Sequence, residues 1–262
     1  MRGRLTAVVA QRPAIRLLIA RDIRLKYERT ALGYFWSILE PLLLAGVYTF
    51  VFSRIGRLNI DDYPLFVISG VLPWMWARGV ITESTKALTS ESKLVKTTAI
   101  PREVWVIRVV GTRLVDFVLA FPVIILIAVL SQHGPSEYFP ALLLAIVLQT
   151  MLLTGLALLL SALNVILGDV QRTTRVITRL LFYTTPILYD VQLLYERFGP
   201  KWSHLYELNP FVGIFELYHA VWFGDRFAGW TPVYISMGAA VVALVVGWVT
   251  FARLEPLVLK EL

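Results

Sequence analysis

Residues that could carry out catalysis are few and scattered along this 262-residue chain. The three histidines, His133, His204 and His219, lie far apart, and none belongs to the H-E-x-x-H pattern of a zinc site. No lysine follows a glycine, so the phosphate-binding loop G-x-x-x-x-G-K-[ST] is absent from the sequence. Cysteine is absent too, which excludes disulfides and cysteine-based metal sites. We therefore expect a protein that is not an enzyme and has no metal or cofactor of its own.

Ionisable residues inside apolar segments are the remaining candidates, because a charge inside a membrane is costly and is retained for a function or a partner. Glu40 interrupts an apolar stretch, so it needs a partner or a polar lumen. Arg113 and Asp116 are three residues apart, which places them on one helical face where they can pair. For Asp61 and Asp62 we favour a solvated loop over a metal site.

Composition points to a membrane protein. The chain is 57% hydrophobic and 16% charged, with a mean hydropathy of +0.69, whereas soluble domains carry about 25% charged residues. The net charge of +7 could suggest nucleic-acid binding. Lysine and arginine, however, cluster in short stretches between apolar runs, as in membrane proteins. We expect no nucleic-acid partner.

Six apolar segments could cross a bilayer, for which a helix needs about 20 residues. The fifth is short and is broken by Thr184-Thr185-Pro186. The expected fold is therefore an all-α integral membrane protein with six transmembrane helices in a single domain, 1–262. The expected spans are residues 31–52, 64–81, 104–130, 138–167, 176–189 and 232–251.

Positive charge indicates the orientation. Lysine and arginine are concentrated before the first span, in the loops that follow the second and fourth spans, and after the sixth, and such segments face the cytoplasm. Both termini are thus expected inside, in a multi-pass protein. The basic residues beyond the N-terminal region that carry this inference are Lys86, Lys93, Lys96, Arg102, Arg172, Arg175, Arg179, Arg253 and Lys260.

The first 30 residues are basic and contain no secretory signal. Pro13 occupies a plausible first helical position. Apolar residues recur at helical spacing, with arginines opposite, which favours an amphipathic helix in the inner membrane interface over a flexible tail. The apolar residues are Ile15, Leu18, Ile19 and Ile23, and the arginines are Arg21 and Arg24.

The segment between the last two spans, 190–231, contains a helix–turn–helix pattern around Asn209-Pro210. Its second helix, over 211–223, is too short to cross a membrane. Such a segment persists at membrane depth only where protein or water surrounds it. We expect short re-entrant outer helices, and an interfacial hairpin is the alternative.

Two motifs near the start of the chain stand out, namely ARDIRLKY at 20–27 and LGYFWSILEP at 32–41. The second resembles the permeases of type-2 ABC exporters, above all those of O-antigen, teichoic acid, galactan and related polysaccharides, and the first resembles the basic interfacial helix of that family. The chain departs from the family at Ile100, where a phenylalanine often precedes the proline. Further matches, in order, are GVLPW at 70–74, KLVK at 93–96, PRE at 101–103, GDV at 168–170, TPILY at 185–189 and NPF at 209–211.

The resemblance implies a homodimeric permease in the bacterial cytoplasmic membrane, surrounded by its lipids. Two copies of a separate cytoplasmic ATPase would bind ATP and magnesium. A lipid-linked polysaccharide would pass through a channel between the two permeases. The residues expected to dock on the ATPase are Arg21, Arg24, Ser90, Lys93, Leu94 and Lys96. Those expected to line the substrate path are Tyr34, Phe35, Trp36, Glu40, Trp74, Trp76, Phe182, Tyr183 and Tyr189.

Two other functions compete with polysaccharide export. A type-2 exporter of drugs or lipids would share the six-span plan, and a membrane glycosyltransferase is the alternative from another class. Abundant aromatic residues near the span ends favour sugar, because an aromatic ring can stack on a sugar ring without requiring one sugar sequence. The competing interpretation of these rings is an interfacial belt. The lack of an acid–base or metal constellation argues against the glycosyltransferase.

Overall fold

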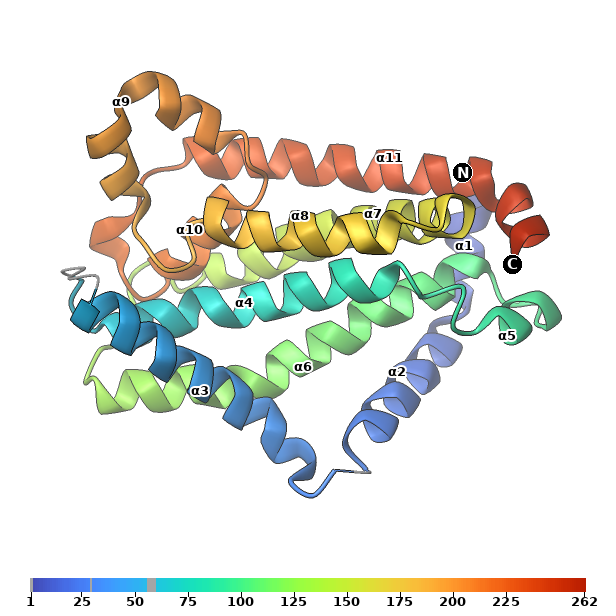
Figure 1. Ribbon diagram of the computed structural model, residues 1–262, viewed down its shortest axis with the longest axis horizontal. Helices are drawn as coiled ribbons and strands as arrows, with labels where there is room; N and C mark the ends of the chain where they lie inside the picture. The colour runs from blue at the N-terminus through green and yellow to red at the C-terminus, as the bar shows by residue number, and fades with distance from the viewer. Residues whose placement is uncertain (1, 29, 56–59) are drawn as a thin grey trace.

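The computed structural model describes residues 2–28, 30–55 and 60–262, and within these ranges every regular element is helical. Five segments of the described chain are long and apolar enough to cross a membrane, and they lie side by side as a bundle (Figure 1). This confirms an all-α fold with membrane-spanning helices. The five are Gly33–Ser53, α4 (Tyr63–Ser84), α6 (Arg102–Leu130), α7 (Ala141–Leu167) and α11 (Thr231–Glu261).

The first of these segments is composite. A 3-10 turn, η1 (Gly33–Phe35), leads into α3 (Trp36–Thr49), and a π-helical turn, η2 (Phe50–Ile55), follows. Only 11% of its most apolar window is buried, compared with 78% for α4. Thus α4 is the central helix, with α3, α6, α7, α8 and α10 packed around it, and α3 lies at the edge of the bundle.

The expected fifth span corresponds to α8 (Val170–Thr184), which has 15 residues and is therefore only about 22 Å long. A full span is about 30 Å, so the six-span count stays a prediction. The helix begins earlier than expected because Gly168 adopts a left-handed conformation (φ 61°) that ends α7. The Gln171 backbone N–H then donates to Asn164 Oδ1 at 2.9 Å. The helix α8 ends at Thr184 because Thr185 has an extended backbone and precedes Pro186.

Close contact between α7 and α11 forms the rest of the core. Gly155 and Gly247 face each other, and a Cβ on either would collide with the backbone of the opposite helix. Small residues at such a crossing let two membrane helices approach closely, which is how they associate without a hydrophobic driving force.

The basic N-terminal region forms two helices, α1 (Arg2–Ala10) and α2 (Arg12–Tyr27), with Pro13 in the first turn of α2. The helix predicted in this region is confirmed, and the structure adds a break at Gln11 that the sequence pattern did not predict. On one side α2 packs against α6, where Ile19 fills the space beside Gly111. The other side carries exposed apolar residues such as Leu17, as expected of a helix lying in a membrane interface.

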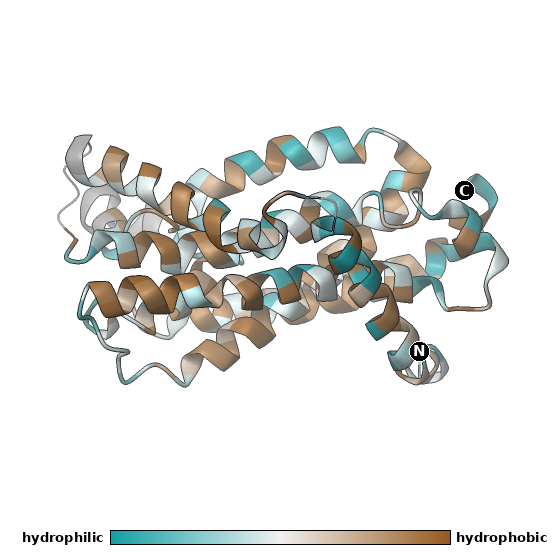
Figure 2. Cartoon of the chain, turned by 90° about the horizontal axis from the view of Figure 1, so that it is seen from below, coloured by the Kyte–Doolittle hydropathy of each residue, from teal (hydrophilic) through white to brown (hydrophobic). Residues whose placement is uncertain are grey.

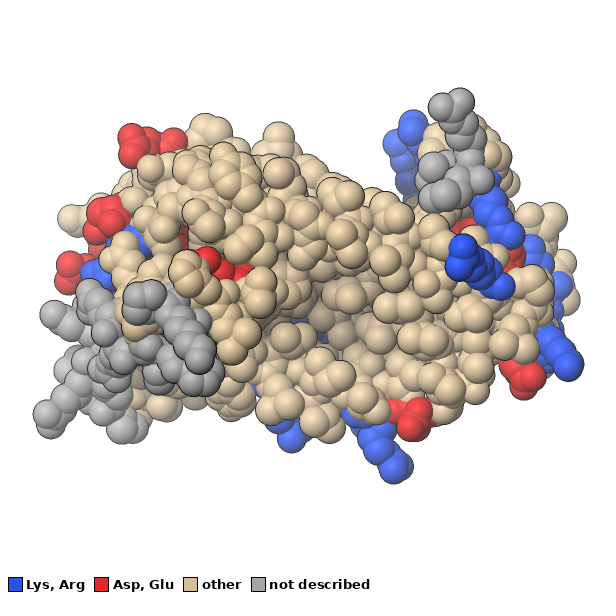
Figure 3. All heavy atoms as spheres, turned by 90° about the horizontal axis from the view of Figure 1, so that it is seen from above, with Lys and Arg blue, Asp and Glu red and all other residues tan. Residues whose placement is uncertain are grey.

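All the segments expected on the cytoplasmic side lie at one end of the bundle (Figure 1). Both termini, α2 and α5 (Ser92–Thr97) share this end, whereas α9 and the 131–140 loop lie at the other. Most of the visible lysine and arginine side chains gather at the end with the termini or along one edge (Figure 3). Apolar residues dominate the middle of most helices (Figure 2). We call the end with the termini the inner end, and its orientation in the membrane remains a prediction.

The outer segment contains α9 (Val191–Glu207), which bends at Gly199 (φ 74°), and α10 (Val212–Ala220). The first helix is thus longer than the sequence suggested. Every residue of α10 is buried, and it packs mainly on α11, α7 and α4. Such enclosure by protein is what a short helix at membrane depth requires.

Candidate functional site

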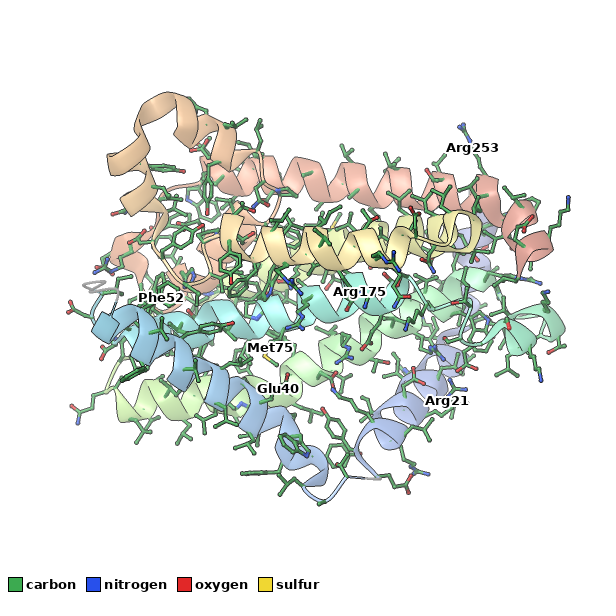
Figure 4. The ribbon with its side chains drawn as sticks, in the orientation of Figure 1. Arg21, Glu40, Phe52, Met75, Arg175 and Arg253 are labelled. Carbon is green, nitrogen blue, oxygen red and sulfur yellow. The ribbon has the colours of Figure 1, made fainter. Side chains whose placement is uncertain are left out.

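A long groove runs along the exposed face of α4, in two hollows that meet. The α6-side hollow, of about 270 Å³, lies among α2, α3, α4 and α6. The α8-side hollow, of about 490 Å³, lies among α3, α4 and α8. Both are lined by Met75, Arg78 and Thr82, so we treat them as one groove. In Figure 4, Glu40 of α3 and Met75 of α4 lie between the ribbons of α3 and α4, beside α6.

The α6-side hollow contains charges of both signs. Asp116 accepts from Lys26 at 2.8 Å and from Arg113 at 2.9 Å, which confirms the predicted pair. Arg113 also pairs with Glu83. Glu40 lines the same hollow with its side chain exposed, and it has no ion pair with any described residue. The groove therefore gives this carboxylate a polar lining in place of a dedicated partner.

The helix α8 presents three distinct faces. Thr174 and Thr178 are buried within the bundle. Arg175 and Arg179 lie beside them and line the α8-side hollow. The remaining face is apolar and exposed, with Val176 56%, Ile177 49% and Leu180 60% exposed. Polar residues thus face the bundle and the groove, and apolar residues face outward; the alternation of colours is visible along the upper edge of Figure 2. This pattern fits a helix that has apolar surroundings on one side and a polar groove on the other.

Aromatic rings form a connected cluster in the outer half of the α8-side hollow. The ring of Phe182 lies 5.7 Å from that of Tyr48, 5.7 Å from that of Trp74 and 5.2 Å from that of Tyr183. Each separation is in the range of a favourable aromatic pair. The four rings come from α3, α4 and α8, so the fold places flat apolar surfaces along the groove.

Three of the predicted path residues lie together where the chain turns from α2 into α3. Tyr34, Phe35 and Trp36 are 55%, 51% and 42% exposed. Trp36 lines the α6-side hollow, and Tyr34 lies 4.7 Å from the ring of Tyr27. Their role in a substrate path remains a prediction, and they stand at the inner side of the groove.

The other predicted path residues differ in position. Trp74 and Trp76 are 4% and 2% exposed, so only a small part of each ring meets the groove while the rest packs in the core. Phe182 and Tyr183 line the α8-side hollow. Tyr189 lines neither hollow; it lies between α8 and the outer segment, and its hydroxyl donates to the Tyr183 carbonyl of α8 at 2.8 Å. The structure thus brings all of these residues but Tyr189 to the groove or its inner rim.

The residues predicted to dock on an ATPase fall into two groups at the inner end. Lys93, Leu94 and Lys96 are exposed on α5, whose Val95 is buried beneath them; Ser90 and, on α2, Arg24 are exposed too. Arg21 instead pairs with Glu91 and Asp22, and Arg108 pairs with the same two carboxylates. This four-residue cluster, which we call the inner clamp, fastens α2 to α6 and to the segment before α5.

Electrostatics within the inner clamp favour the ionised carboxylate. Burial opposes the charge of Glu91, but hydrogen bonds from Arg21 and Arg108 outweigh it, so the pKa of Glu91 lies below its ordinary value. On α2, burial and the nearby Asp116 carboxylate raise the pKa of Tyr27, whose hydroxyl donates to Asp116 at 3.0 Å.

Sequence reasoning misses the three arginines of the α8-side hollow, and Tyr48 with them. It treats Arg175 and Arg179 only as inner charges that set the orientation, and it does not single out Arg78. The structure places Arg175 and Arg179 on α8, facing the groove beside Arg78. The available signal was their spacing of four residues, which puts both on one face of a helix. Tyr48, on the same groove wall, was hidden within an apolar run.

Comparison with known proteins agrees with this architecture. The ABC-2 type transporter family model matches residues 13–223. The O-antigen export system permease protein RfbA of Myxococcus xanthus is 27% identical over 238 residues, 91% of this chain and 90% of that protein. A Klebsiella pneumoniae protein of the same name is 31% identical over 195 residues, 74% of each chain. The polysialic acid transport protein KpsM of Escherichia coli is 22% identical over 212 residues, 79% of this chain and 80% of that protein.

The family match covers both groove-flanking helices, the central α4 and the inner-end helix α5. With the membrane-spanning bundle and the matched relatives that span most of its length, it shows that this chain is a membrane protein of the ABC-2 type transporter family.

Proposed function

We propose that this chain is the permease subunit of an ATP-driven exporter that moves a lipid-linked polysaccharide across the bacterial cytoplasmic membrane. The names of its relatives, which include O-antigen export and polysialic acid transport, support this substrate class. Two copies would form the channel, and two copies of a separate ATPase subunit would drive transport.

The groove is the observation that carries the proposal. It combines aromatic rings with polar and charged residues along α4, and α3 and α8 flank its α8-side hollow. The outer faces of these two flanking helices are apolar: Leu43 and Val47 of α3 are 56% and 58% exposed, and Phe50 of η2, which follows α3, is 63% exposed. A second copy seated against α3 and α8 would close the groove into a lumen.

A polymer many sugars long has to slide through such a lumen instead of occupying one closed pocket. Sliding requires contacts that are individually weak and tolerant of sequence. The cluster of Tyr48, Trp74, Phe182 and Tyr183 offers flat faces of this kind, whereas a pocket of many directed hydrogen bonds would retain the chain.

An ATPase partner is proposed because the sequence has no phosphate-binding loop. The exposed part of α5 lies at the inner end with α2 and both termini (Figure 1). The inner clamp joins α2 to the segment before α5. A force applied to α5 could thereby reach α2 and the start of α3, beside the groove.

Alanine at Tyr34 and Trp36 tests the path. We expect the double substitution to lower surface polysaccharide in the native host while complex yield and basal ATP hydrolysis stay near the wild-type level. Trp230→Ala is the matched control, since Trp230 is equally exposed (42%, as is Trp36) but directly precedes α11 at the outer end and lines neither hollow of the groove. If the double variant instead lowers protein yield and leaves export per complex unchanged, the rings are interfacial anchors.

A further inference from the structure

Three arginines in the α8-side hollow have no carboxylate to neutralise them. Arg78 of α4 and Arg175 and Arg179 of α8 line this hollow, and no aspartate or glutamate is among its lining residues. None of the three forms an ion pair with a carboxylate of the described chain. In the α6-side hollow, which Arg78 also lines, Glu83 and Asp116 are both paired with arginine, and Glu40, which has no ion pair with a described residue, lies in that hollow and not in the α8-side one. The α8-side hollow is therefore a concentration of unneutralised positive charge.

Keeping these charges together is costly. Arg175 and Arg179 are four residues apart on one helix, an arrangement in which like charges repel. Counted from the inner ends of their helices, Arg175, Arg78 and Arg179 lie roughly 7, 9 and 13 Å into the bundle. Arginine at such a depth in a spanning bundle marks a functional site by default.

The chemistry of the ligand follows from the donors. Guanidinium groups bind phosphate through paired, charge-assisted hydrogen bonds. Thr82 and Gln171 line the same hollow and add neutral polar groups. Outward from the arginines along α4 and α8 come Trp74, Phe182 and Tyr183. A ligand that carries a phosphate with an attached sugar would meet both parts in that order.

We propose that Arg78, Arg175 and Arg179 form a binding site for a phosphate or pyrophosphate group at the inner part of the α8-side hollow. Two sources share this chemistry, namely the phosphate of the exported, lipid-linked glycan and the headgroup of an anionic membrane lipid. The first source rests on the proposed function. The site itself does not, because phosphate binding can be measured without transport.

The binding experiment uses the full-length permease in nanodiscs of phosphatidylcholine, titrated with inorganic pyrophosphate by calorimetry. Arg175→Gln with Arg179→Gln should weaken binding at least tenfold, since each lost charge-assisted hydrogen bond is worth about a factor of ten. Arg172→Gln is the matched control, because Arg172 is exposed on the same helix but does not line the hollow. The conservative pair Arg175→Lys and Arg179→Lys should fall between wild type and glutamine, because lysine keeps the charge and loses the planar fork.

A second set of nanodiscs, with equal parts of phosphatidylcholine and phosphatidylglycerol, distinguishes the sources. Weaker pyrophosphate binding there, with the difference abolished in the glutamine double variant, would assign the site to lipid headgroups. Unchanged binding would assign it to the phosphate of the cargo.

The proposal is overturned if wild-type permease does not bind pyrophosphate, or if Arg172→Gln weakens binding as much as the double variant does. The second outcome would mean general attraction to surface charge. Surface polysaccharide in cells that lack the wild-type gene is measured separately. Normal polysaccharide in those cells would refute the export function and leave the phosphate site standing, so the two failures can be told apart.

Discussion

Replacing Arg108 with methionine should loosen α2 from the bundle and leave the membrane helices folded. The Arg108 side chain is 6% exposed and contacts the Asp22 and Glu91 carboxylates, each at 3.2 Å. Methionine keeps much of the apolar contact with α6 and removes both charge-assisted interactions. Arg21 still pairs with the two carboxylates, so the inner clamp is weakened and not abolished.

The size of the effect follows from these contacts. A hydrogen bond to a charged group contributes about 1.5–3 kcal/mol, and breaking a fully buried ion pair costs about 3–5 kcal/mol. Asp22 and Glu91 are partly exposed, at 20% and 23%, and keep Arg21 as a partner. We therefore expect α2 attachment to weaken by about 2–4 kcal/mol. That is a change of roughly thirtyfold to several-hundredfold in the population of detached α2.

Thiol labelling measures this population, since the chain has no cysteine to remove. A cysteine at Ile19, which faces Gly111 of α6, should react slowly while α2 is attached and much faster after Arg108→Met. Arg16→Met in the same Ile19→Cys background is the control, because Arg16 is exposed on α2 and has no ion pair with a described carboxylate. Equal labelling rates in the two variants would refute the clamp.

The pH dependence gives an independent check on the same clamp. Its Glu91 has a folded-state pKa below the ordinary 4.5, held there by Arg21 and Arg108 against the effect of burial. A lowered carboxyl pKa stabilises the attached state above the ordinary pKa, and that contribution is lost as pH falls through the folded value. The thiolate is the reactive form, so every labelling rate falls in acid. The rate at position 19 divided by that of a freely exposed cysteine at the same pH should therefore rise as pH falls, and Glu91→Gln should flatten this rise.

Further expectations concern the two ends of the bundle. Lys93→Glu with Lys96→Glu should reduce co-purification with the ATPase subunit and leave membrane insertion intact; unchanged complex yield and transport would place the docking surface elsewhere. Single cysteines at Ser92 and Glu137 should, respectively, resist and react with an impermeant thiol reagent on whole cells, and labelling of the first would reverse the topology. At the outer end, burial lowers the pKa of His133. Hydrogen bonds to the Trp222 carbonyl and to Asp62 outweigh this effect, so the pKa of His133 lies above its ordinary value of 6.5. His133→Ala should therefore destabilise the protein below that pH in thermal unfolding, with the loss shrinking as pH rises through the folded pKa.

Sequence patterns were enough to predict those features that depend only on neighbouring residues in the chain. The long apolar runs around Leu114–Leu130 and Pro232–Phe251 predicted α6 and α11, because a membrane span needs length and apolarity and little else. The Arg113–Asp116 pair followed from a spacing of three residues. The helix α2 followed from its period and from Pro13.

Contacts between distant segments could not be read from the sequence. Lys26 pairs with Asp116, 90 residues away, and Arg21 with Glu91, 70 residues away. Both require α2 to fold back along α6, which no local pattern specifies. These pairs turn Arg21, predicted as a docking residue, toward the bundle. In the same way the burial of α10 depends on three helices that surround it from elsewhere in the chain.

The helix α8 shows why a charge count can give the side of the membrane and still leave the site hidden. The number of its arginines supports placing the start of α8 on the cytoplasmic side of the membrane. The function of each arginine, however, depends on which neighbour it faces. Placed in lipid, an arginine costs up to about 2.5–3.5 kcal/mol at the centre of a span and less toward the interface. In a single copy, Arg78, Arg175 and Arg179 are all exposed along the groove, so part of this free-energy penalty would apply to each of the three. A second copy that covers α3 and α8 would replace lipid with a hydrated lumen and remove the cost. The charges that make the groove suited to a phosphate-bearing cargo thus also favour closing it.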